Sequence, residues 1–249
     1  MGLGEEITEL IKTKTEEANQ SEFYRIPLVG FSSASDPLYA KIKELIGPYH
    51  LRPTDILPEV KTIVSFFLPF SKKVVEANRR EPDVPAREWV DSYIHANDLI
   101  DQISLDLVAL MTARNLKAVM VNASKNYDQK ALKATWSHRS AAFVAGLGRF
   151  GLNRMLITPV GGAGRYGTVL ISEELTPSVR PEEELCLFWK NGSCQYCLEH
   201  CPVKALGDGP DEFDRQACHR KLLAITPYAS INRSQHVCGK CDVGPCAIF

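Results

Sequence analysis

Hydrophobic and polar positions follow two different periods along the first part of the chain, and these periods predict helices and strands in turn. The sequence Ser35-Asp36-Pro37 predicts the start of a helix, with Asp36 as its cap and Pro37 as its first residue. Apolar side chains spaced three to four residues apart predict helices over 5–19, 38–46, 89–115 and 137–145. Short apolar or β-branched runs predict strands over 26–31, 60–68, 116–121, 155–158 and 168–171.

Two stretches carry more specific expectations. Residues 60–68 are almost continuously apolar, which is typical of a strand buried on both faces within a mixed or parallel sheet. Residues 76–87 are charged and contain two prolines, so we expect an exposed loop there that moves or covers a site. Strands that alternate with helices over 1–174 predict an α/β fold, in the form of an α+β sandwich.

The polar segment 177–184, which contains two prolines, is the expected boundary between two domains. It separates an α/β domain over 1–176 from a cysteine-rich domain over 177–249. The N-terminal domain is the expected place for a substrate or cofactor, and its helices and strands contain no cysteine.

Charge and composition exclude several classes of protein. With 249 residues and a net charge of −1, the chain shows no basic excess that would indicate nucleic-acid binding. The N-terminus lacks the basic and apolar regions of a secretory signal, so we expect a cytoplasmic protein. The most apolar run, 63–70, is far short of the roughly 20 residues that cross a bilayer, and no membrane partner is expected.

The candidate chemistry lies in the cysteines, because all 8 fall between Cys186 and Cys246. Residues 194–202 contain C-x2-C-x3-C-P, the tail of the bacterial ferredoxin pattern, in which the cysteine before proline binds the other cluster of a pair. Two 4Fe-4S clusters need about eight thiolates, which is the number present. The interleaved scheme assigns Cys186, Cys194, Cys197 and Cys246 to one cluster, and Cys201, Cys218, Cys238 and Cys241 to the other.

Two alternatives use the same cysteines differently. Four disulfides would suit a small secreted domain, whereas this chain has a large cysteine-free region and no export signal. A structural zinc could bind the two C-x2-C pairs, Cys194 with Cys197 and Cys238 with Cys241. Zinc would leave the other four cysteines without a role.

Glycine-rich turns form the next candidate site. Residues 146–151 and 162–167 both match G-x-G-x-x-G, but the first follows a predicted helix and the second leads into a strand. A dinucleotide fingerprint has the opposite order, strand then helix, so we do not expect a Rossmann site. These glycines serve turns, or let the backbone approach a flat cofactor. The candidate cofactor-binding residues are Gly146, Gly148, Gly151, Asn153, Gly162 and Gly164.

Three side chains are candidates for catalysis. His138 stands beside Arg139 at a helix start near the glycine turns. Asp98 lies three residues from His95 on one face of the long helix, where a solvated pair is the alternative. Asp128 completes the set.

Several segments together resemble epoxyqueuosine reductases and their relatives. They are LVGF at 28–31, SHRSAA at 137–142, AGLGRFGLN at 145–153 and LI at 156–157, followed by the order of the cysteines. The resemblance implies a nitroreductase-like, corrinoid-binding α/β domain, related to reductive dehalogenases, joined to a ferredoxin-like two-cluster domain. Cobalamin is then a candidate cofactor, and a ferredoxin or flavodoxin is a candidate electron donor.

The same resemblance shows where this sequence differs. Where the family places an acidic proton donor, this sequence has Leu132, and Asp128 is out of register. The chain stops at Phe249, before the C-terminal helical extension that many of these enzymes use on tRNA, so tRNA is not an expected partner. We therefore expect a redox protein that reduces a bound cobalamin or substrate. The alternatives are an electron carrier for a separate corrinoid protein, and an epoxyqueuosine reductase acting on tRNA.

Overall fold

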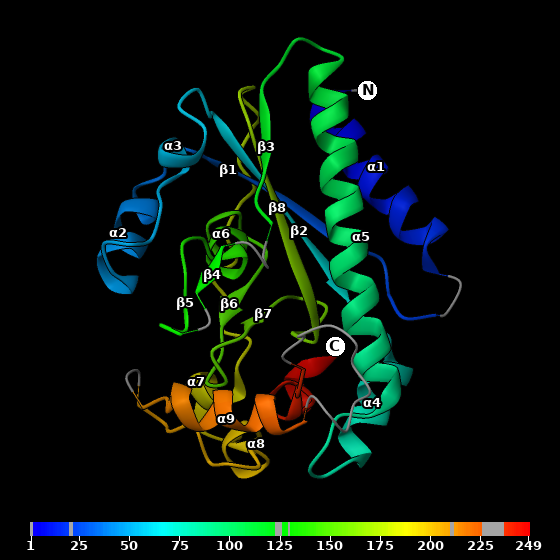
Figure 1. Cartoon of the computed structure of the whole chain (residues 1–249), viewed down its shortest axis with the longest axis vertical. Helices are drawn as coiled ribbons and strands as arrows, with labels where there is room; N and C mark the ends of the chain where they lie inside the picture. Colours follow the sequence, from blue (N-terminus) through cyan, green and yellow to red (C-terminus); the bar gives the residue numbers. More distant parts are fainter. Residues whose placement is uncertain (1, 20–21, 123–125, 129, 210–211, 226–236) are drawn as a thin grey trace.

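A four-stranded sheet forms the centre of the computed structural model (Figure 1), which describes residues 2–19, 22–122, 126–128, 130–209, 212–225 and 237–249. The strand order is β1-β2-β8-β3. The strands are β1 (Leu28–Ser33), β2 (Thr62–Pro69), β8 (Gly164–Ile171) and β3 (Ala118–Met120). Because β2 and β8 are the inner strands, the sheet brings together segments about a hundred residues apart in the chain.

The expected mixed or parallel sheet is wrong, although the strand itself is confirmed. β2 pairs antiparallel with β1 on one side and with β8 on the other. All eight residues of β2 are buried, as expected for a central strand. The apolar run therefore reports that both faces are covered, and strand direction does not follow from it, since an antiparallel sheet between two helical layers gives the same pattern.

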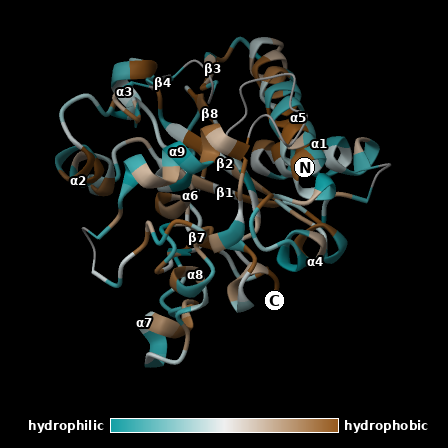
Figure 2. Ribbon diagram, turned by 60° about the horizontal axis from the view of Figure 1, so that its bottom comes forward, coloured by the Kyte–Doolittle hydropathy of each residue, from teal (hydrophilic) through white to brown (hydrophobic). Residues whose placement is uncertain are grey.

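One face of the sheet is covered by α1 (Leu3–Glu17), α5 (Arg87–Thr112) and α4 (Lys72–Arg80). Their apolar stripes meet β2 and β8 in the largest hydrophobic cluster of the described residues, which includes Ile7, Ile103, Leu107 and Phe66. Figure 2 shows the hydrophobic colouring along the central strands. The predicted helices over 5–19 and 89–115 are confirmed, with ends shifted by two or three residues.

The opposite face is covered by α2 (Pro37–Ile46) and α6 (His138–Val144), with the short α3 (Pro53–Ile56) near them (Figure 1). Asp36 caps α2 by accepting a 3.0 Å hydrogen bond from the Leu38 N–H, as predicted. A second cluster lies here, in which Trp136 packs with Tyr39, Ile63 and Leu170.

The exposed loop expected over 76–87 is wrong for residues 76–80, which belong to a helix, and is confirmed for residues 81–84, which are exposed and lie outside any helix or strand. α4 continues to Arg80, and its side chains Val74, Val75, Ala77 and Asn78 are buried. Ser71 caps this helix, because its hydroxyl accepts a hydrogen bond from the Val74 N–H. The many charged side chains of α4 make its one buried face difficult to recognise in the sequence.

Two short hairpins flank α6. The first joins β4 (Tyr127–Asp128) to β5 (Lys133–Ala134), and the second joins β6 (Arg149–Phe150) to β7 (Leu156–Ile157). The first glycine motif thus lies between α6 and β6, and the second opens β8. Neither follows a strand and opens a helix, which supports the exclusion of a dinucleotide fingerprint.

The cysteine-rich region contains α7 (Leu187–Asn191), α8 (Tyr196–Glu199) and α9 (Arg215–Ile225), then two 3-10 turns, η2 (Lys240–Asp242) and η3 (Pro245–Ala247). The last turn returns to the sheet region, where the Gly162 and Ala163 N–H groups donate to the Cys246 and Ala247 carbonyls. The boundary expected at residue 177 stays a prediction, as do the nitroreductase-like and ferredoxin-like descriptions. Within the described residues, no helix combines the length and the apolar character needed to cross a membrane.

Candidate functional site

All eight cysteines are free thiols, and they form two groups. The first group contains Cys186, Cys194, Cys197 and Cys246, which line one small cavity together with Leu152, Ile157 and Tyr196. Cys241 also lines this cavity. Four cysteines that span sixty residues of sequence therefore surround one space.

Local structure explains how the first group forms. Cys186 caps the start of α7, and Gly192 ends that helix with φ of +73°, a conformation that glycine adopts without strain. The chain then turns so that Cys194 and Cys197 lie on either side of the start of α8. Cys246 arrives separately, within η3.

The second group contains Cys201, Cys218, Cys238 and Cys241. The pKa of the Cys218 thiol is raised to about 11, chiefly by burial and then by the neighbouring Cys238 and Cys201. Burial likewise raises the pKa of Cys241 well above its ordinary value, and Asp242, Cys238, Cys218 and Cys201 act in the same direction. These mutual effects mark the four thiols as neighbours.

The first group behaves in the same way. Burial raises the pKa of Cys197 to about 11, with Cys186 and Cys194 as the next causes. The pKa of Cys246 is raised to about 12, chiefly by burial, with Asp242 and the other three thiols of the group as further causes. Thiolates in such places need a nearby positive centre, because burial disfavours the charged form.

Backbone N–H groups point at some of the sulfur atoms. The Leu152 N–H donates to Cys186 Sγ at 3.5 Å, and the Ala205 N–H donates to Cys201 Sγ at 3.3 Å. Hydrogen bonds of this kind stabilise thiolate charge and tune iron–sulfur clusters. Each of the two cysteine groups therefore has at least one such N–H···S hydrogen bond.

The donor set fits two four-iron clusters better than one metal ion. Four thiolates around one zinc ion would each lie about 2.3 Å from it, in a compact tetrahedron. Among the described residues, no group of three or more His, Cys, Asp or Glu side chains could hold a single ion. A cubane is a larger body that spaces its thiolates more widely, and the two groups supply four each.

Helix α4 clamps the loop that carries the last three cysteines. Asn78 Nδ2 donates to the Cys238 carbonyl at 3.1 Å, and Arg79 donates to the Val243 and Gly244 carbonyls. Lys240 Nζ donates to both oxygens of Asn78 at 2.7 Å. Burial lowers the pKa of Lys240 to about 8, and the nearby Cys238, Glu81 and Asp83 act in the opposite direction.

His138 and Arg139 begin a buried polar group between the sheet and the cysteines. His138 Nδ1 lies 2.8 Å from Thr168 Oγ1, and its Nε2 is buried with no hydrogen-bond partner. Burial lowers the pKa of His138 to about 4, with Arg165 and Arg139 as further causes, so the imidazole is neutral at pH 7. As a neutral ring it can accept or donate one hydrogen bond to a bound group, but it cannot be an imidazolium acid.

Asp242 approaches this group from the cysteine side. Its side chain is 3% exposed, and Oδ1 is buried without a partner. Burial raises the pKa of Asp242 well above its ordinary value, and Arg139 and Arg165 oppose this rise. Orphaned atoms on His138 and Asp242 are what a polar ligand or water would satisfy.

The two aspartates proposed as catalytic residues lie elsewhere. Asp128 is exposed and its Oδ1 accepts hydrogen bonds from the Lys130 and Ala131 N–H groups, which lower its pKa. It therefore stabilises the β4–β5 turn as a carboxylate. Asp98 lies on α5 near Tyr24, whose pKa is raised above its ordinary value by burial and by Asp98. Catalytic roles for Asp98, Asp128 and His138 stay predictions.

The candidate cofactor-binding glycines lie against the protein's own backbone. A Cβ on Gly148 would stand 2.1 Å from the Ile157 carbonyl oxygen, and one on Gly146 would stand 2.6 Å from that of Val179. Gly164, with φ of +159°, has similarly close contact with Leu68, and Gly151 with Ile157. Gly162 has ordinary contact distances only. Close packing thus accounts for most of these glycines, and their contact with a cofactor stays a prediction.

Asn153 is the candidate nearest to the thiols. Its Nδ2 donates to the Cys241 carbonyl at 2.9 Å, while its Oδ1 accepts from the Met155 N–H. It also lines the cavity of the first group. Asn153 therefore joins the glycine turn to the cysteine loop.

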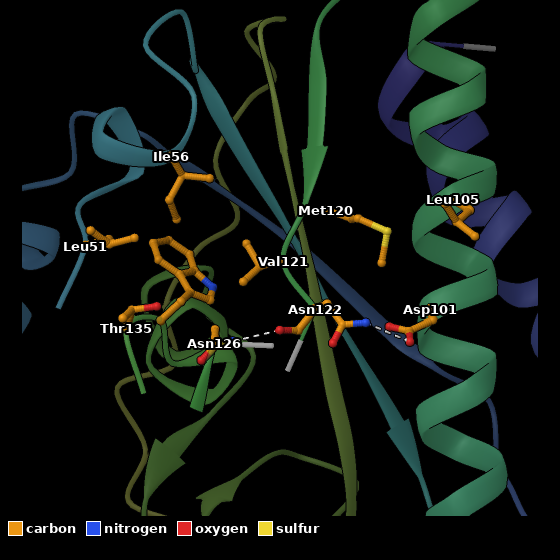
Figure 3. A pocket seen from close by; sticks show the side chains of 10 residues that line it. Leu51, Ile56, Asp101, Leu105, Met120, Val121, Asn122, Asn126 and Thr135 are labelled. Carbon is orange, nitrogen blue, oxygen red and sulfur yellow. Dashed lines mark hydrogen bonds between the residues drawn. The ribbon is translucent and has the colours of Figure 1, made fainter. Parts of the chain in front are cut away.

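A groove of about 560 Å³ lies at the β3 edge of the sheet (Figure 3). Its walls are mainly apolar and include Leu51, Met120, Val121 and Trp136. Polar groups gather at one end, where Asn122 Nδ2 donates to Asp101 Oδ2 and Asn126 Nδ2 donates to the Asn122 carbonyl. Asn126 Oδ1 is buried without a partner. This volume is typical of small-molecule pockets.

Sequence reasoning missed Asn78, Arg79, Lys240 and Asp242. Asn78 and Arg79 lie in the segment that the sequence predicted to be a loop. A helix signal was available just before it, where Ser71 can cap a helix and Val74 and Val75 begin its buried face. Lys240 and Asp242 carry no local pattern, because their importance comes from burial.

No family model matches the sequence. The chain is 26% identical over 239 residues to an epoxyqueuosine reductase of Lactococcus garvieae, which covers 91% of this chain and 61% of the relative. It is 25% identical over 173 residues to an epoxyqueuosine reductase of Bacillus cereus, covering 67% of this chain and 41% of that relative. The chain spans about three fifths or less of the length of these relatives.

Solved structures show the same likeness at the level of fold. Epoxyqueuosine reductase from Bacillus subtilis matches with a TM-score of 0.56 and 20% identity, over 98% of this chain and 67% of that one. A catabolic reductive dehalogenase in complex with 3-bromo-4-hydroxybenzoic acid matches with a TM-score of 0.57 and 16% identity, over 78% of this chain and 27% of that one. The mixed α/β fold is thus the fold of the epoxyqueuosine reductase structures.

Proposed function

Because the chain is epoxyqueuosine reductase-like in sequence and fold, and structurally related to reductive dehalogenases, we propose that it is an iron–sulfur redox protein. Two 4Fe-4S clusters would pass low-potential electrons to an acceptor bound by the N-terminal part of the chain. The observation that carries the proposal is the division of eight free cysteines into two neighbouring groups of four.

The ligand sets are those of the interleaved scheme. Cys186, Cys194, Cys197 and Cys246 would hold the first cluster, and Cys201, Cys218, Cys238 and Cys241 the second. When bound, the clusters supply one-electron transfer. The chain's own part is to bury the thiolates, to donate N–H groups to sulfur, and to hold the two sets close together through Cys241, which borders the cavity of the first.

Electrons would enter from a donor protein such as a ferredoxin or flavodoxin and leave toward a substrate or a cobalamin. The orphaned atoms of His138 and Asp242 and the groove at β3 are among the places where the described residues offer unused polar groups. His138, neutral at pH 7, would orient a bound group by one hydrogen bond. It would not protonate that group as an imidazolium.

A complete corrinoid does not fit the described groove. Its volume of about 560 Å³ lies within the range of about 300–1,000 Å³ for pockets that enclose drug-sized ligands. A corrinoid with its nucleotide tail is larger than such ligands. The size of the groove therefore favours a second candidate function, in which the clusters reduce the cobalt of a separate corrinoid protein.

An epoxyqueuosine reductase acting on tRNA is the third candidate, suggested by the names of the relatives. Against it, Leu132 occupies the place of the expected acid and is 6% exposed. Asp128, the nearest acidic side chain in sequence, is held as a carboxylate by two N–H groups. This candidate therefore needs another proton donor.

The test of the proposal is anaerobic purification with metal analysis. Iron and acid-labile sulfide should each approach about eight per chain. Zinc without sulfide would contradict the two clusters. Cysteines paired in disulfides would leave the protein without iron and without zinc, which would contradict the clusters as well.

Two further assays separate the candidate acceptors. Cobalamin retained by the reduced protein, with a change in its absorption spectrum, would support an internal corrinoid. Cobalamin that stays free would favour reduction of a separate corrinoid protein or of a substrate. Epoxyqueuosine that stays unchanged in tRNA, after incubation with reduced protein and cobalamin, would exclude the third candidate.

A further inference from the structure

Lys240 is a buried cation in the cysteine loop. It opens η2, between Cys238 and Cys241, and its side chain is 3% exposed. Its Nζ donates to the backbone oxygen and to Oδ1 of Asn78, both at 2.7 Å. Both acceptors are oxygens of Asn78 and carry no charge, and Lys240 forms no ion pair with another described residue.

Asn78 fixes the ammonium against the loop. It is fully buried near the C-terminal end of α4, which Figure 1 shows beside the C-terminal segment. Its Nδ2 donates to the Cys238 carbonyl, and its Oδ1 also accepts from the Ala86 N–H at 3.0 Å. In the chain, Lys240 is two residues after Cys238 and directly before Cys241. Charge and sulfur ligand are therefore held together by one rigid set of contacts.

An unpaired ammonium in this position is costly. Removing a cation from water costs several kcal/mol unless a negative charge or a set of acceptors compensates. The two Asn78 oxygens supply part of that compensation, and the exposed Glu81 and Asp83 carboxylates, which form no ion pair with Lys240 among the described residues, supply a weaker part. A cubane held by four thiolates carries a net negative charge, which increases by one electron on reduction, and its ligand Cys238 is two residues from Lys240 in the chain.

The two cysteine groups differ in their charged surroundings. In the second group, Lys240 and Lys221 act on Cys238, while the Asp214 and Asp242 carboxyls act on Cys218 and Cys241. Asp242 therefore acts on both groups, and the two lysines distinguish the second. The charged neighbours of Cys197 and Cys246 in the first group are other thiols and the Asp242 carboxyl, with no cation among them. Nearby positive charge stabilises the reduced form of a cluster, whereas negative charge destabilises it.

We propose that Lys240 is the buried counter-charge of the second cluster and sets its reduction potential above that of the first. Electrons would then rest on the cluster of Cys201, Cys218, Cys238 and Cys241. The inference depends on the proposed function, because it needs both clusters. Lys240 would act on the cluster by its charge, without being one of its ligands.

The experiment is a redox titration of the intact protein, with the reduced clusters followed by electron paramagnetic resonance. Lys240→Gln removes the charge but keeps a donor for Asn78, and Lys240→Arg keeps the charge. Lys190→Gln on α7, whose side chain is 50% exposed and paired with Glu183, is the control for a change of one unit in net charge. Iron and sulfide are measured for every variant.

At a fixed poise, Lys240→Gln should lower the ratio of reduced to oxidised second cluster more than tenfold, a fall of about 59 mV for a one-electron couple. Lys240→Arg and Lys190→Gln should stay near the wild-type potential. If Lys240→Gln keeps full iron and sulfide and its potentials are unchanged, Lys240 is not the counter-charge, although the two clusters remain supported. Loss of iron in Lys240→Gln but not in Lys240→Arg would support it, and loss in both would overturn it. Absence of sulfide from the wild type would refute the proposed function instead.

Discussion

The sheet region and the cysteine region are held together in different ways. Every residue of β2 is buried, and α1, α4 and α5 pack apolar side chains against the sheet. In contrast, α7 and α8 bury none of their residues, and α9 buries only Ile225. Apolar burial stabilises the first region, whereas the second has too small a core of its own and, by our proposal, depends on metal for its order.

The C-terminal segment joins these regions. Val243 and Ala247 belong to the hydrophobic cluster of the sheet region, while Cys241 and Cys246 belong to the thiol groups. A change in the sheet should therefore act on global stability, and a change in the thiols on local order and metal content. The following predictions test that difference.

The largest effect is expected from Cys197→Ala. Loss of one of four ligands should remove one cluster, so that iron and sulfide fall from about eight to about four per chain. Amide hydrogens around α7 and α8 should exchange faster, while those of β2 and β8 stay protected. Ser193→Ala, an exposed position in the same turn, is the control. Full iron and sulfide in Cys197→Ala would contradict the ligand assignment.

Phe66→Ala should affect the other region. Phe66 is fully buried in β2, and its ring packs directly on Gly167 of β8. Removal of a buried phenyl ring typically lowers the free energy of unfolding by about 3–5 kcal/mol. Denaturant titration measures this, and Ile26→Ala, at a side chain that is 76% exposed, should change it by less than about 0.5 kcal/mol.

Metal analysis of the same variant sharpens the comparison. Iron per folded chain should be unchanged in Phe66→Ala, since the thiols keep their places. A proportional loss of iron would mean that the two regions are not separately stabilised.

His138 should make stability depend on pH. Its pKa is about 4 in the folded chain, against 6.5 for the ordinary side chain, so the unfolded chain binds more protons between these values. The free energy of unfolding should thus fall as pH falls from 6.5 toward 4, by about 3 kcal/mol at roughly 1.4 kcal/mol per pKa unit. His138→Gln should flatten this slope, and His200→Gln, at an exposed histidine, should not. Parallel curves for wild type and His138→Gln would show that His138 is not responsible.

The smallest effect is expected at the cap of α2. Asp36→Ala removes both the bond from the Leu38 N–H and the 2.8 Å contact with Arg180. The free energy of unfolding should fall by about 0.5–2 kcal/mol. Asp36→Asn keeps the cap and loses only the exposed ion pair, so thermal unfolding should place it between Ala and wild type. Equal losses in the two variants would assign the effect to the ion pair.

Local patterns predicted most of the sheet region. The periodic apolar positions of α1 and α5 and the cap at Asp36 are confirmed. The loop prediction failed over 76–80, where charged side chains conceal the buried face of α4, and held over 81–84, which are exposed and outside any helix or strand. Strand direction failed because an apolar run records burial and carries no information on pairing.

In the cysteine region, spacing and placement have separate origins. Cys194 and Cys197 are brought together by one short turn, so their proximity is contained in the sequence. The approach of Cys246 to Cys186, and of Cys241 to Cys218, depends on a chain path that no local pattern records. Likewise, nothing around Lys240 in the sequence indicates that Asn78 will hold it.

The sequence by itself determined which residues can do chemistry, because thiol ligands, glycine turns and helix caps act over a few neighbouring positions. Only the tertiary structure decided the surroundings of those residues. Two turn N–H groups hold the exposed Asp128 as a carboxylate, whereas burial keeps the His138 imidazole neutral. Burial also gives Lys240 its significance, since a lysine in water is ordinary, whereas one that is 3% exposed depends on the negative charges around it, which include Cys238 and the Glu81 and Asp83 carboxylates.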